Sequence, residues 1–443
     1  MPADLLTIEV DQQLPTETDV VIVGGGIIGI ATAYELAKKG VRAIVVEKGI
    51  IADEQSSRNW GWCRKQNRDE KEIPLIKYSL MRWAEISEEI GADISFRATG
   101  VTYVSDKESD IAKWEAWNKM AKPYGMDCRM LSAQEAQQLA YGTEKAWIGG
   151  ETSPSDGRAE PGIATTRLAE AARKLGVKIF QFCAARGVEV TNGQVSGVYT
   201  EKGFVKCSSA VCAGGAWSSL FLRRIGLSLP QASVYSTAFR TEEAPEFLKG
   251  NLSVPGLAIR RRLDGGYTLG LAAQGRMDVT PQGLRYAFKF LKMLQERRGN
   301  LKIGIGKTFF QGPEAFYGKW SFDEKSPFER YRKLSLEPDP TLVHRLMSVL
   351  EETFPLLKGV KVKEAWSGLI DSTPDGIPVI SKVDEIRGLV VSSGYSGHGF
   401  GIGLGAGRLT ADLVANDNPI VDATPFRFAR LVDGSKIQRP GMM

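Results

Sequence analysis

The stretch SSRNWGWCRKQNRD, residues 56–69, gathers side chains that can bind anions and exclude water. It contains two tryptophans, one cysteine and four cationic side chains, without the period of a strand or a surface helix. Hydroxyl and guanidinium donors suit phosphate and carboxylate oxygens. Because a loop with such groups on a rigid scaffold is usually a site, we expect residues 56–69 to line one. The alternative is a surface loop with two half-buried tryptophans.

A glycine-rich turn precedes this stretch and must position it. Gly24, Gly26 and Gly29 form G-x-G-x-x-G between an apolar strand at 19–23 and a predicted helix at 27–39. The first glycine allows a tight turn, the second lets a pyrophosphate approach the backbone, and the third lets the helix lie close to the sheet. The helix N-terminus supplies free N–H groups and partial positive charge for phosphates.

An acidic residue completes the motif. A second buried strand at 41–46 ends at Glu47, whose carboxylate can accept hydrogen bonds from both ribose hydroxyls and would repel a 2′-phosphate. Strand, glycines, helix, strand and acid in this order predict a dinucleotide-binding unit; the alternative is a tight turn in another α/β protein. The motif does not separate FAD from NAD, although a nicotinamide enzyme would not need residues 56–69.

Composition and charge exclude several classes of function. The chain has 443 residues, 43% of them hydrophobic, enough for two or three domains. Its formal net charge is only +5, without blocks of like charge, so no nucleic-acid partner is expected. Five irregularly spaced cysteines and two histidines predict neither a disulfide framework nor a metal site. Since no signal peptide or apolar stretch of spanning length is visible, we expect a cytoplasmic protein.

Several stretches resemble one superfamily of flavoproteins. DVVIVGGGIIGIATAYELAKKG, VVEKG, the S-S-R run, AVCAGGAWSSLF, AWSGLIDSTPDGIPVIS and GYSGHGFGIGLGAGRLTADLV resemble the FAD-dependent D-amino-acid oxidase, glycine oxidase and sarcosine oxidase superfamily. A narrower resemblance, to its bacterial L-amino acid deaminases, rests on EQSSR, GVKIFQFCAARGVEV, TEKGFVKCSSAVCAGG, SPFERYR and FPLLKGVKVKEAWSG.

The resemblance implies non-covalently bound FAD, because no cysteine occupies the attachment position known from sarcosine oxidase. Residues 56–58 would face the pyrophosphate and ribityl chain, residues 59–62 would lie beside the ring, and Val188 would meet the adenine. The expected cofactor-binding residues are Gly24, Gly26, Ile27, Ile28, Gly29, Glu47, Lys48, Ser56, Ser57, Arg58, Asn59, Trp60, Gly61, Trp62, Val188, Ala213, Gly214, Trp217, Gly368, Gly397, His398, Gly399 and Gly401.

The substrate carboxylate needs a cation, and a guanidinium can bond both of its oxygens. D-selective oxidases and glycine oxidase carry an arginine just after the W-x-G-L segment, where this chain has Ile370. The absence of this arginine fits a substrate bound in the opposite orientation, with the L configuration. Arg64 is the first candidate for the cation; the alternative is that it forms a structural salt bridge. The next candidates for the cation are the arginines at 260–262. The alternative for these residues is a solvated strand end, which we favour for most of that run.

Two further residues are candidates for the substrate pocket. His398, in S-G-H-G-F, is expected beside the flavin edge or the substrate, but not as a catalyst; the alternative is a histidine held by backbone hydrogen bonds. Trp366 is expected to wall the cavity, against simple packing of a strand. Arg64, Trp366 and His398 are therefore the predicted pocket residues.

The predicted fold is α/β plus α+β: a discontinuous Rossmann-like FAD-binding domain and a substrate domain on a mainly antiparallel sheet. Residues 1–95, 155–230 and 362–443 are assigned to the FAD-binding domain. Residues 96–154 and 231–361 are assigned to the substrate domain, with a basic amphipathic helical insertion near 282–325.

Within the insertion, residues 282–298 predict an amphipathic helix with one apolar stripe. The stripe consists of Leu284, Ala287, Phe288, Leu291 and Leu294. We expect it to pack on the helix's own domain. The alternative is peripheral contact with a membrane, because the deaminases have a comparable inserted module that helps membrane contact.

The resemblance implies oxidative deamination of L-amino acids to 2-oxo acids and ammonia, by hydride transfer from the α-carbon to FAD. Since the chain begins close to its first strand, we expect no anchor, and O2 rather than a respiratory acceptor as oxidant, giving H2O2. The alternatives are an FAD-dependent dehydrogenase of N-substituted amino acids or opines that passes electrons to a quinone, and a non-catalytic FAD-binding subunit. The expected partners are the amino acid and the electron acceptor; a homo-oligomer stays open.

Overall fold

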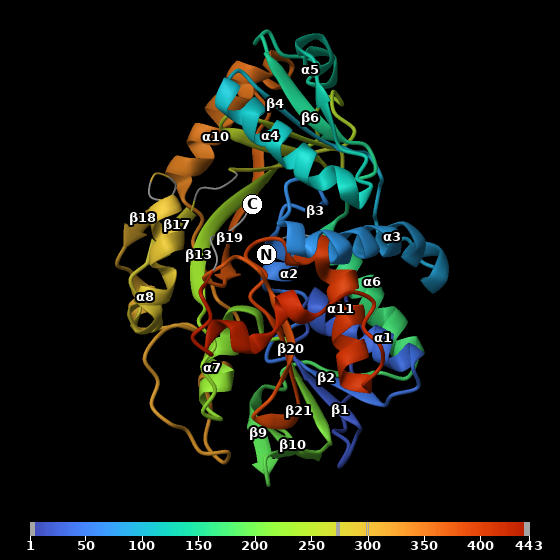
Figure 1. The fold of residues 1–443 in the computed structure, drawn as a ribbon, viewed down its shortest axis with the longest axis vertical. Helices are drawn as coiled ribbons and strands as arrows, with labels where there is room; N and C mark the ends of the chain where they lie inside the picture. Colours follow the sequence, from blue (N-terminus) through green and yellow to red (C-terminus); the bar gives the residue numbers. More distant parts are fainter. Residues whose placement is uncertain (1–4, 272–274, 298, 300, 438–443) are drawn as a thin grey trace.

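Two sheets organise the molecule (Figure 1). The computed structural model describes residues 5–271, 275–297, 299 and 301–437. The strands of the first sheet are β1 Val20–Val23, β2 Ala43–Val46, β8 Lys178–Phe180, β9 Ala185–Thr191, β10 Gln194–Thr200, β11 Gly203–Lys206, β12 Ser209–Cys212, β20 Val379–Val383 and β21 Ile386–Ser393. They run in the order β11-β10-β21-β12-β1-β2-β8, with β9 beside β10 and β20 beside β21.

The centre of the first sheet is parallel and buried. β1 pairs in parallel with β2 and with β12, and β12 pairs in parallel with β21. VVIV in β1 and AIVV in β2 are continuous apolar runs, because both faces of a parallel sheet are covered. One face packs into a core with helices α1 (Ile27–Lys38), α3 (Ile73–Ile90), α6 (Pro161–Lys174) and α11 (Gly399–Ala415).

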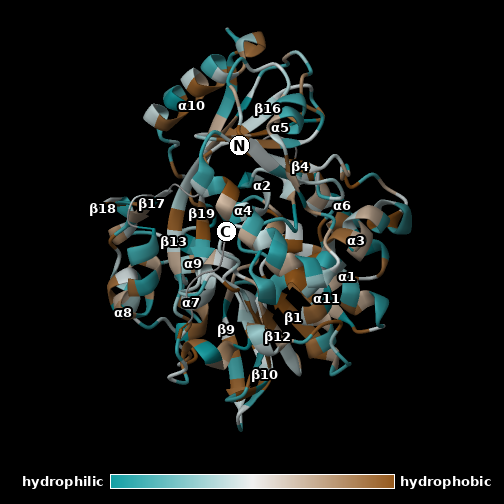
Figure 2. Ribbon diagram, turned by 45° about the horizontal axis from the view of Figure 1, so that its top comes forward, coloured by the Kyte–Doolittle hydropathy of each residue, from teal (hydrophilic) through white to brown (hydrophobic). Residues whose placement is uncertain are grey.

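Small residues bring α11 against α1. A Cβ on Gly407 would lie 2.4 Å from the Ala31 Cβ, and one on Gly403 would lie 2.9 Å from the Ile27 side chain. Figure 2 shows hydrophobic residues in brown along these two helices and the neighbouring β1. The contact brings the first residues of the two helices, Ile27 and Gly399, to the wall of one cavity.

The second sheet is mainly antiparallel. Its strands are β4 Val101–Ser105, β5 Arg129–Leu131, β6 Gly149–Ser153, β13 Ala232–Thr241, β14 Asn251–Val254, β15 Leu257–Arg261, β16 Tyr267–Gly270, β17 Gly275–Asp278, β18 Leu301–Gly304 and β19 Val362–Ser372. They run in the order β18-β17-β13-β16-β15-β14-β4-β6-β5, with β19 beside β13. The β14–β4 and β17–β18 pairs are parallel and the other pairs described here are antiparallel.

The observed architecture has the predicted fold class, but one strand changes domain. β19, which begins at Val362, was assigned to the FAD-binding domain. It pairs with β13 from Ala232 opposite Ser372 to Thr241 opposite Val362. By its hydrogen bonds the strand therefore belongs to the second sheet, and the chain returns to the first sheet after residue 372.

Helix α8 (Pro281–Glu296) packs through a different face from the predicted one. Its buried residues include Tyr286, Phe290 and Met293. The predicted stripe points outward: the exposed fractions of Leu284, Phe288 and Leu291 are 61%, 88% and 47%. The expectation that this stripe packs on its own domain is wrong for these three residues, because α8 is apolar on two faces; Leu294, also in the stripe, packs against the buried face. Residue 298, at the end of the predicted helix, lies outside the described residues.

The other helices are short or cover the second sheet. They are α2 Gln55–Arg58, α4 Glu108–Ala121, α5 Ala133–Leu139, α7 Ser218–Arg223, α9 Pro327–Arg330 and α10 Pro340–Thr353. In the part of the chain that the structure describes, no helix combines the length and the apolar composition needed to cross a membrane.

Candidate active site

A first cavity lies at the carboxyl ends of β1 and β2, where α1 and α11 begin. Its walls enclose about 1210 Å³, counted to the open mouth. The carboxyl ends of parallel strands are the usual ligand site of such a sheet, because the loops and helix N-termini meet there.

The glycine turn closes one side of this cavity so tightly that side chains are excluded. Gly24 has φ +112°, and a Cβ there would lie 2.4 Å from the Ala213 carbonyl oxygen. A Cβ on Gly29 would lie 2.0 Å from the Gly24 carbonyl oxygen. The turn and the first helical turn therefore fit only as glycines, and they leave the backbone of Gly24 and Gly26 facing the cavity.

Glu47 lies at the end of β2 and shapes the same wall. Its Oε2 accepts from the Gly25 N–H at 2.8 Å and its Oε1 from the Gly49 N–H at 2.7 Å. Burial raises the pKa of Glu47, although the Lys48 charge and the two N–H donors oppose this. Each carboxylate oxygen keeps a second lone pair, so Glu47 can still accept from hydroxyl groups of a ligand.

The start of the 56–69 stretch supplies a hydrogen-bond acceptor to the N-terminus of α1. Ser56 Oγ accepts from the Ile27 N–H at 2.9 Å, one of the free donors at the helix N-terminus. Ser57 turns away and donates to the Glu54 carbonyl oxygen at 3.3 Å. Arg58 also turns away: it donates to the Leu334 carbonyl oxygen at 3.0 Å. Of the three residues expected at the pyrophosphate, Ser56 is therefore the one placed on this wall.

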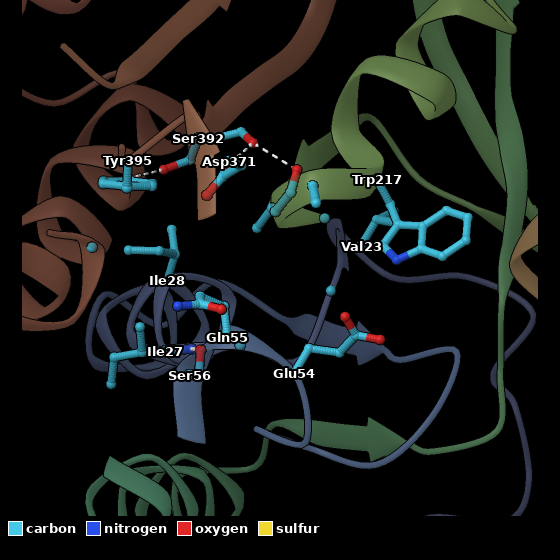
Figure 3. Close-up of a pocket in the computed structure, with 18 of the residues that line it drawn as sticks. Val23, Ile27, Ile28, Glu54, Gln55, Ser56, Trp217, Asp371, Ser392 and Tyr395 are labelled. Atoms are coloured by element: carbon cyan, nitrogen blue, oxygen red, sulfur yellow. Dashed lines mark hydrogen bonds between the residues drawn. The ribbon is translucent and has the colours of Figure 1, made fainter. Parts of the chain in front are cut away.

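The opposite wall comes from the C-terminal part of the chain. Figure 3 shows Asp371, Ser392 and Tyr395 across the cavity from Ile28 and Ser56. These residues lie in β19, at the end of β21 and just before α11. The cavity thus lies between the glycine turn of the first sheet and the last residues of β19.

A second cavity adjoins the first. Asn59, Ile370, Gly397 and Phe400 line both of them. The additional walls are aromatic: Trp60, Trp62, Tyr103 and Trp114. These rings contact one another edge to face, with 5.9 Å between the centroids of the two loop tryptophans and 6.0 Å from Trp62 to Tyr103. A small molecule in this cavity would lie between aromatic rings, largely out of water.

Two guanidinium groups line the second cavity side by side. Arg64 lies over the Tyr103 ring, 5.9 Å from its centroid, and the Arg68 Nε donates to the Arg64 carbonyl oxygen at 3.4 Å. Among the described residues, no carboxylate forms an ion pair with either one. Burial, with the Arg64 charge beside it, lowers the pKa of Arg68 to about 9, so that it stays cationic at neutral pH. The pair is a ready anion site.

Buried polar contacts fix the loop that carries these arginines. Lys65 Nζ forms an ion pair with Asp156 at 3.1 Å, and Asn67 donates to the Glu151 carboxyl group. Burial raises the pKa of Glu151 to about 8, although amide donors oppose this. Trp117 Nε1 donates to the Arg68 carbonyl oxygen at 2.8 Å. The arginines are therefore held in position before any ligand arrives.

His398 lies in the second cavity, just before α11. Its Nε2 and a Glu72 carboxylate oxygen are 2.5 Å apart, and both side chains are buried. Burial lowers the pKa of His398, although Glu72 opposes this, so the ring is neutral at pH 7. A neutral ring that donates its Nε2 proton to Glu72 fixes the carboxylate beside the loop of the two arginines.

The structure distributes the predicted cofactor residues over both cavities. Those on the first cavity are Gly24, Gly26, Ile27, Ile28, Glu47, Lys48, Ser56, Asn59, Ala213, Gly214, Trp217, Gly397 and Gly399. Arg58, Trp60, Trp62, His398 and Gly401 line the second cavity, together with Asn59 and Gly397.

Five predicted cofactor residues line neither cavity: Gly29, Ser57, Gly61, Val188 and Gly368. A Cβ on Gly61 would lie 2.2 Å from the Ala159 carbonyl oxygen, and one on Gly368 would lie 2.3 Å from the Gln55 Oε1. Both glycines therefore serve close packing inside the protein. Val188 packs its side chain into the second hydrophobic core. The wall residue on that strand is Ala185.

Two predicted substrate-site residues have structural partners. The Trp366 indole donates to the Arg58 carbonyl oxygen at 2.9 Å, so it holds the loop from behind instead of walling the cavity. Arg260 is fully buried in a bidentate pair with Glu160, at 2.8 and 2.9 Å. It is neither a carboxylate ligand for substrate nor a solvated strand end.

The structure also brings in residues that sequence reasoning missed. Arg68, Gln55, Phe328 and Asp371 line the cavities. Arg68 lies within the 56–69 stretch and Gln55 just before it, but the sequence carried no signal that singled out either residue. An isolated acid in an apolar strand next to the T-P-D segment was a usable signal for Asp371. Phe328 lies in the SPFERYR stretch, which is far from the glycine motifs in sequence.

The chain is similar to known flavoproteins over nearly its whole length. Residues 19–413 match the family model described as FAD dependent oxidoreductase, and the chain belongs to this family. It is 26% identical over 431 residues to the sarcosine oxidase subunit beta of Arthrobacter sp, covering 96% of this chain and 93% of that protein. It is also 26% identical over 424 residues to the glycine oxidase of Geobacillus kaustophilus, covering 93% of this chain and 97% of that protein.

Two solved structures are similar at higher identity. The L-amino acid deaminase of Proteus myxofaciens, in complex with anthranilate, has a TM-score of 0.91 and 32% identity, covering 96% of each chain. The L-amino acid deaminase of Proteus vulgaris has a TM-score of 0.90 and 32% identity, covering 96% of this chain and 99% of that one. Together they support the superfamily and its L-amino acid deaminase branch.

The first cavity fits FAD, the cofactor of this family. The glycine turn leaves room for a pyrophosphate against the α1 N-terminus, and Glu47 offers acceptors to a ribose. Two buried polar atoms of wall residues, the Gln55 Oε1 and the Trp217 Nε1, lack a protein partner. Since buried polar groups are normally satisfied, both are suited to a polar ligand. The ring end must then lie where Ile370 and Gly397 join the two cavities.

Proposed function

We propose that this protein catalyses the flavin-dependent oxidative deamination of L-amino acids to 2-oxo acids and ammonia, with FAD held non-covalently. The observation that carries the proposal is the second cavity, which adjoins the ring end of the FAD site and contains Arg64 and Arg68. The likeness to two L-amino acid deaminases over 96% of the chain supports the same conclusion.

The charges of the second cavity fit one carboxylate. Arg64 and Arg68 carry two positive charges, and Glu72, bonded to the neutral His398, opposes one of them from a distance. The two guanidinium groups on this wall attract the carboxylate of an α-amino acid. The planar guanidinium groups can bond both carboxylate oxygens and so orient the α-carbon.

The side of the cavity on which the cations lie supports the L configuration. Ile370, at the position where D-selective oxidases and glycine oxidase carry an arginine, is an apolar wall shared by the two cavities. The carboxylate is therefore bound by the loop that follows Trp62. If the carboxylate and the side chain of the substrate exchange places in the cavity, the α-hydrogen points to the ring only in the opposite enantiomer. A carboxylate bound on this side therefore favours L-amino acids.

The chain's own residues bind, orient and desolvate the amino acid. Bound FAD supplies a two-electron acceptor for the hydride from the α-carbon. Arg64 and Arg68 hold the carboxylate, while Trp60, Trp62 and Tyr103 exclude water from the reacting carbon. The amine loses a proton, and its lone pair forms the C=N bond as the hydride leaves. Water then hydrolyses the imine to the 2-oxo acid and ammonia.

An anaerobic substrate panel tests the proposal. The holoprotein is mixed with L-phenylalanine, L-alanine, L-arginine, D-phenylalanine or sarcosine, and loss of flavin absorbance is followed. We expect bleaching by at least one L-amino acid, none by its D enantiomer, and ammonia and a 2-oxo acid after reoxidation. Bleaching by sarcosine alone would contradict the proposal and favour a dehydrogenase of N-substituted amino acids. If no amine bleached the flavin, a non-catalytic FAD-binding subunit would be favoured.

The electron acceptor is a separate question, and O2 with H2O2 as product is our first proposal. Exposed apolar side chains on α8 and on residues 303–316, together called the α8 module, favour a second candidate, a quinone in a membrane. These side chains are Leu284, Phe288, Leu291, Ile303, Ile305, Phe310 and Phe316, which are 47% to 88% exposed. Large exposed apolar patches on soluble proteins mark interaction sites. Measuring reoxidation of the reduced holoprotein by O2 and by a soluble quinone separates the two: O2 fails as the acceptor if peroxide does not form at the rate of turnover.

A further inference from the structure

A buried carboxyl group with no part in amino acid binding faces the FAD cavity. Asp371 follows Ile370 in β19, is only 8% exposed and lines the cavity. Figure 3 shows its carboxyl group directed into the gap between the wall with Tyr395 and the wall with Ile28. A buried carboxyl group normally accepts hydrogen bonds on both of its oxygens, from the protein or from a ligand.

The protein supplies donors to one oxygen of this group. Asp371 Oδ2 accepts from the Gly394 N–H at 2.8 Å, from the Gln231 Nε2 at 3.1 Å and from the Ser393 Oγ at 3.4 Å. Oδ1 accepts none of these three bonds; the backbone N–H groups of Asp371 and Tyr395 also approach the carboxyl group. The three donors hold the carboxyl plane and leave Oδ1 as a fixed acceptor on the cavity wall.

The place of Asp371 along the cavity identifies the part of FAD that it meets. The pyrophosphate end lies at Gly24 and Gly214, and the ring end lies at Ile370. Asp371 is next to Ile370 in the chain, and its donor Ser393 also donates to the Gly215 carbonyl oxygen at 3.2 Å. Asp371 therefore lies between the two ends. The ribityl chain joins these two ends of FAD, and its hydroxyl groups are hydrogen-bond donors.

We infer that Asp371 binds the ribityl chain of FAD, with Oδ1 accepting a hydrogen bond from a ribityl hydroxyl. The bond fixes the ring relative to the second cavity from the side opposite the glycine turn. Burial raises the pKa of Asp371 to about 6, although the Gly394 N–H opposes this, so the group is mainly an ionised acceptor at pH 7.5. The inference concerns the cofactor alone, and it stands or falls independently of the amino acid substrate.

The test compares FAD with ADP, which lacks the ribityl chain. FAD release from the full-length holoprotein on dilution, followed by flavin fluorescence, gives the Kd of FAD. Displacement of FAD by ADP gives the Kd of ADP. For Asp371→Ala we expect the Kd of FAD to rise about tenfold to a hundredfold, since a hydrogen bond to a charged group is lost. The Kd of ADP should change less than about twofold.

Two further variants keep the result decisive. Asp371→Asn retains an acceptor oxygen without the charge, so its Kd for FAD should rise less than that of Asp371→Ala. If the alanine variant does not fold, the asparagine variant alone tests the inference. Asp375→Asn removes another buried acid, which pairs with Arg430 at 2.9 Å, and should leave the ratio of the two Kd values unchanged. Equal weakening of FAD and ADP by Asp371→Asn and Asp371→Ala, or no weakening of FAD, would overturn the inference.

Discussion

Arg64 and Arg68 differ from Arg260 in what surrounds them. Arg260 pairs with Glu160, and Arg58 donates to backbone carbonyl oxygens, so both are already satisfied. Arg64 and Arg68 share one cavity wall and repel each other. Two neighbouring cations repel each other, and a bound carboxylate reduces this unfavourable electrostatic free energy. At the scale of single residues, two neighbouring cations on one cavity wall mark the candidate substrate site better than the residue type does.

Removing either guanidinium should weaken substrate binding without affecting FAD. For Arg68→Gln and Arg64→Gln we expect kcat/KM for the best L-amino acid to fall about tenfold to a hundredfold, through loss of a charge-assisted hydrogen bond. Steady-state kinetics measure this, and the flavin content of the purified variants should match the wild type. Lys113→Gln is the matched control: this cation lines the same cavity but is 64% exposed and 3.7 Å from Asp110, so kcat/KM should not change. Unchanged kinetics in both arginine variants would remove the pair from the substrate site.

Glu151 should make the stability of the protein depend on pH. Its pKa is about 8 in the folded protein against 4.5 unperturbed, so the folded state holds a proton that the unfolded state releases. Its contribution to stability is therefore full at low pH and is lost as the pH rises toward 8 and above. In Glu151→Gln this dependence disappears, and the fall in Tm between pH 6 and pH 9 should be smaller than in the wild type. Parallel Tm profiles for the two proteins would contradict the buried, protonated state.

At the scale of elements, the FAD site depends on how closely two helices approach the sheet. α1 begins at the glycine turn, receives its N-terminal acceptor from Ser56 and packs along α11 through Gly403 and Gly407. Each contact leaves no room for a Cβ, so the helix position is set by backbone atoms. A cofactor that binds the helix N-terminus therefore depends on packing along the whole helix.

Gly29→Ala should disturb this element strongly. The new Cβ would lie 2.0 Å from the Gly24 carbonyl oxygen, so the helix must move away from the turn. We expect a loss of about 1–3 kcal/mol or more in stability from overpacking, and less bound FAD. Thermal unfolding and the flavin-to-protein absorbance ratio measure the two effects. Gly318→Ala, where a Cβ meets nothing within 4 Å, is the control and should behave like the wild type.

At the scale of the whole molecule, a buried ion pair joins the two domains. Glu160, at the start of α6, bonds to Arg260 in β15 of the second sheet. Burial opposes ionisation of Glu160, but Arg260 and Arg262 outweigh it and lower its pKa to about 2. The second sheet is thereby fixed to helix α6 of the first sheet's core through charge as well as packing.

Breaking this pair should destabilise the protein and change its acid unfolding. Arg260→Met leaves Glu160 without its main counter-ion, and we expect a loss of about 3–5 kcal/mol. The folded pKa of Glu160, about 2, lies below its unperturbed 4.5, so its contribution is present above pH 4.5 and lost as the pH falls toward 2. Denaturant titrations from pH 3 to pH 7 measure both effects. In Glu160→Gln the acid-dependent part should be missing; an unchanged slope would show that other carboxyl groups control acid unfolding.

The exposed apolar surface of the α8 module predicts lipid binding by the whole molecule. Phe288 is 88% exposed, and Ile305 and Phe310 are 76% and 78% exposed. We expect the protein to co-sediment with anionic vesicles and Phe288→Ser with Phe310→Ser to reduce this severalfold, at unchanged Tm, because these side chains have little protein to pack against. Phe290→Ser is the contrasting variant: this buried residue should lower Tm instead. Absence of the wild-type protein from the vesicle pellet would end the membrane proposal.

Local sequence determined the parts of this protein that depend on neighbours in the chain. The glycine turn, the strands at 20–23 and 43–46 and the acid at Glu47 were predictable, because turn geometry, apolar runs and the helix N-terminus act over a few residues. The two-sheet fold class followed from resemblance to a family and has the expected form.

Only the tertiary structure decided which side chains have partners. Glu160 satisfies Arg260 from about a hundred positions away in the chain, Trp366 turns to the Arg58 carbonyl oxygen, and the Leu284 face of α8 stays exposed while another face is buried. These outcomes depend on contacts between distant segments, which no local pattern encodes. Arg64 was a candidate from its place in the 56–69 stretch, but only the completed set of pairs shows that Arg64, Arg68 and Asp371 face a cavity.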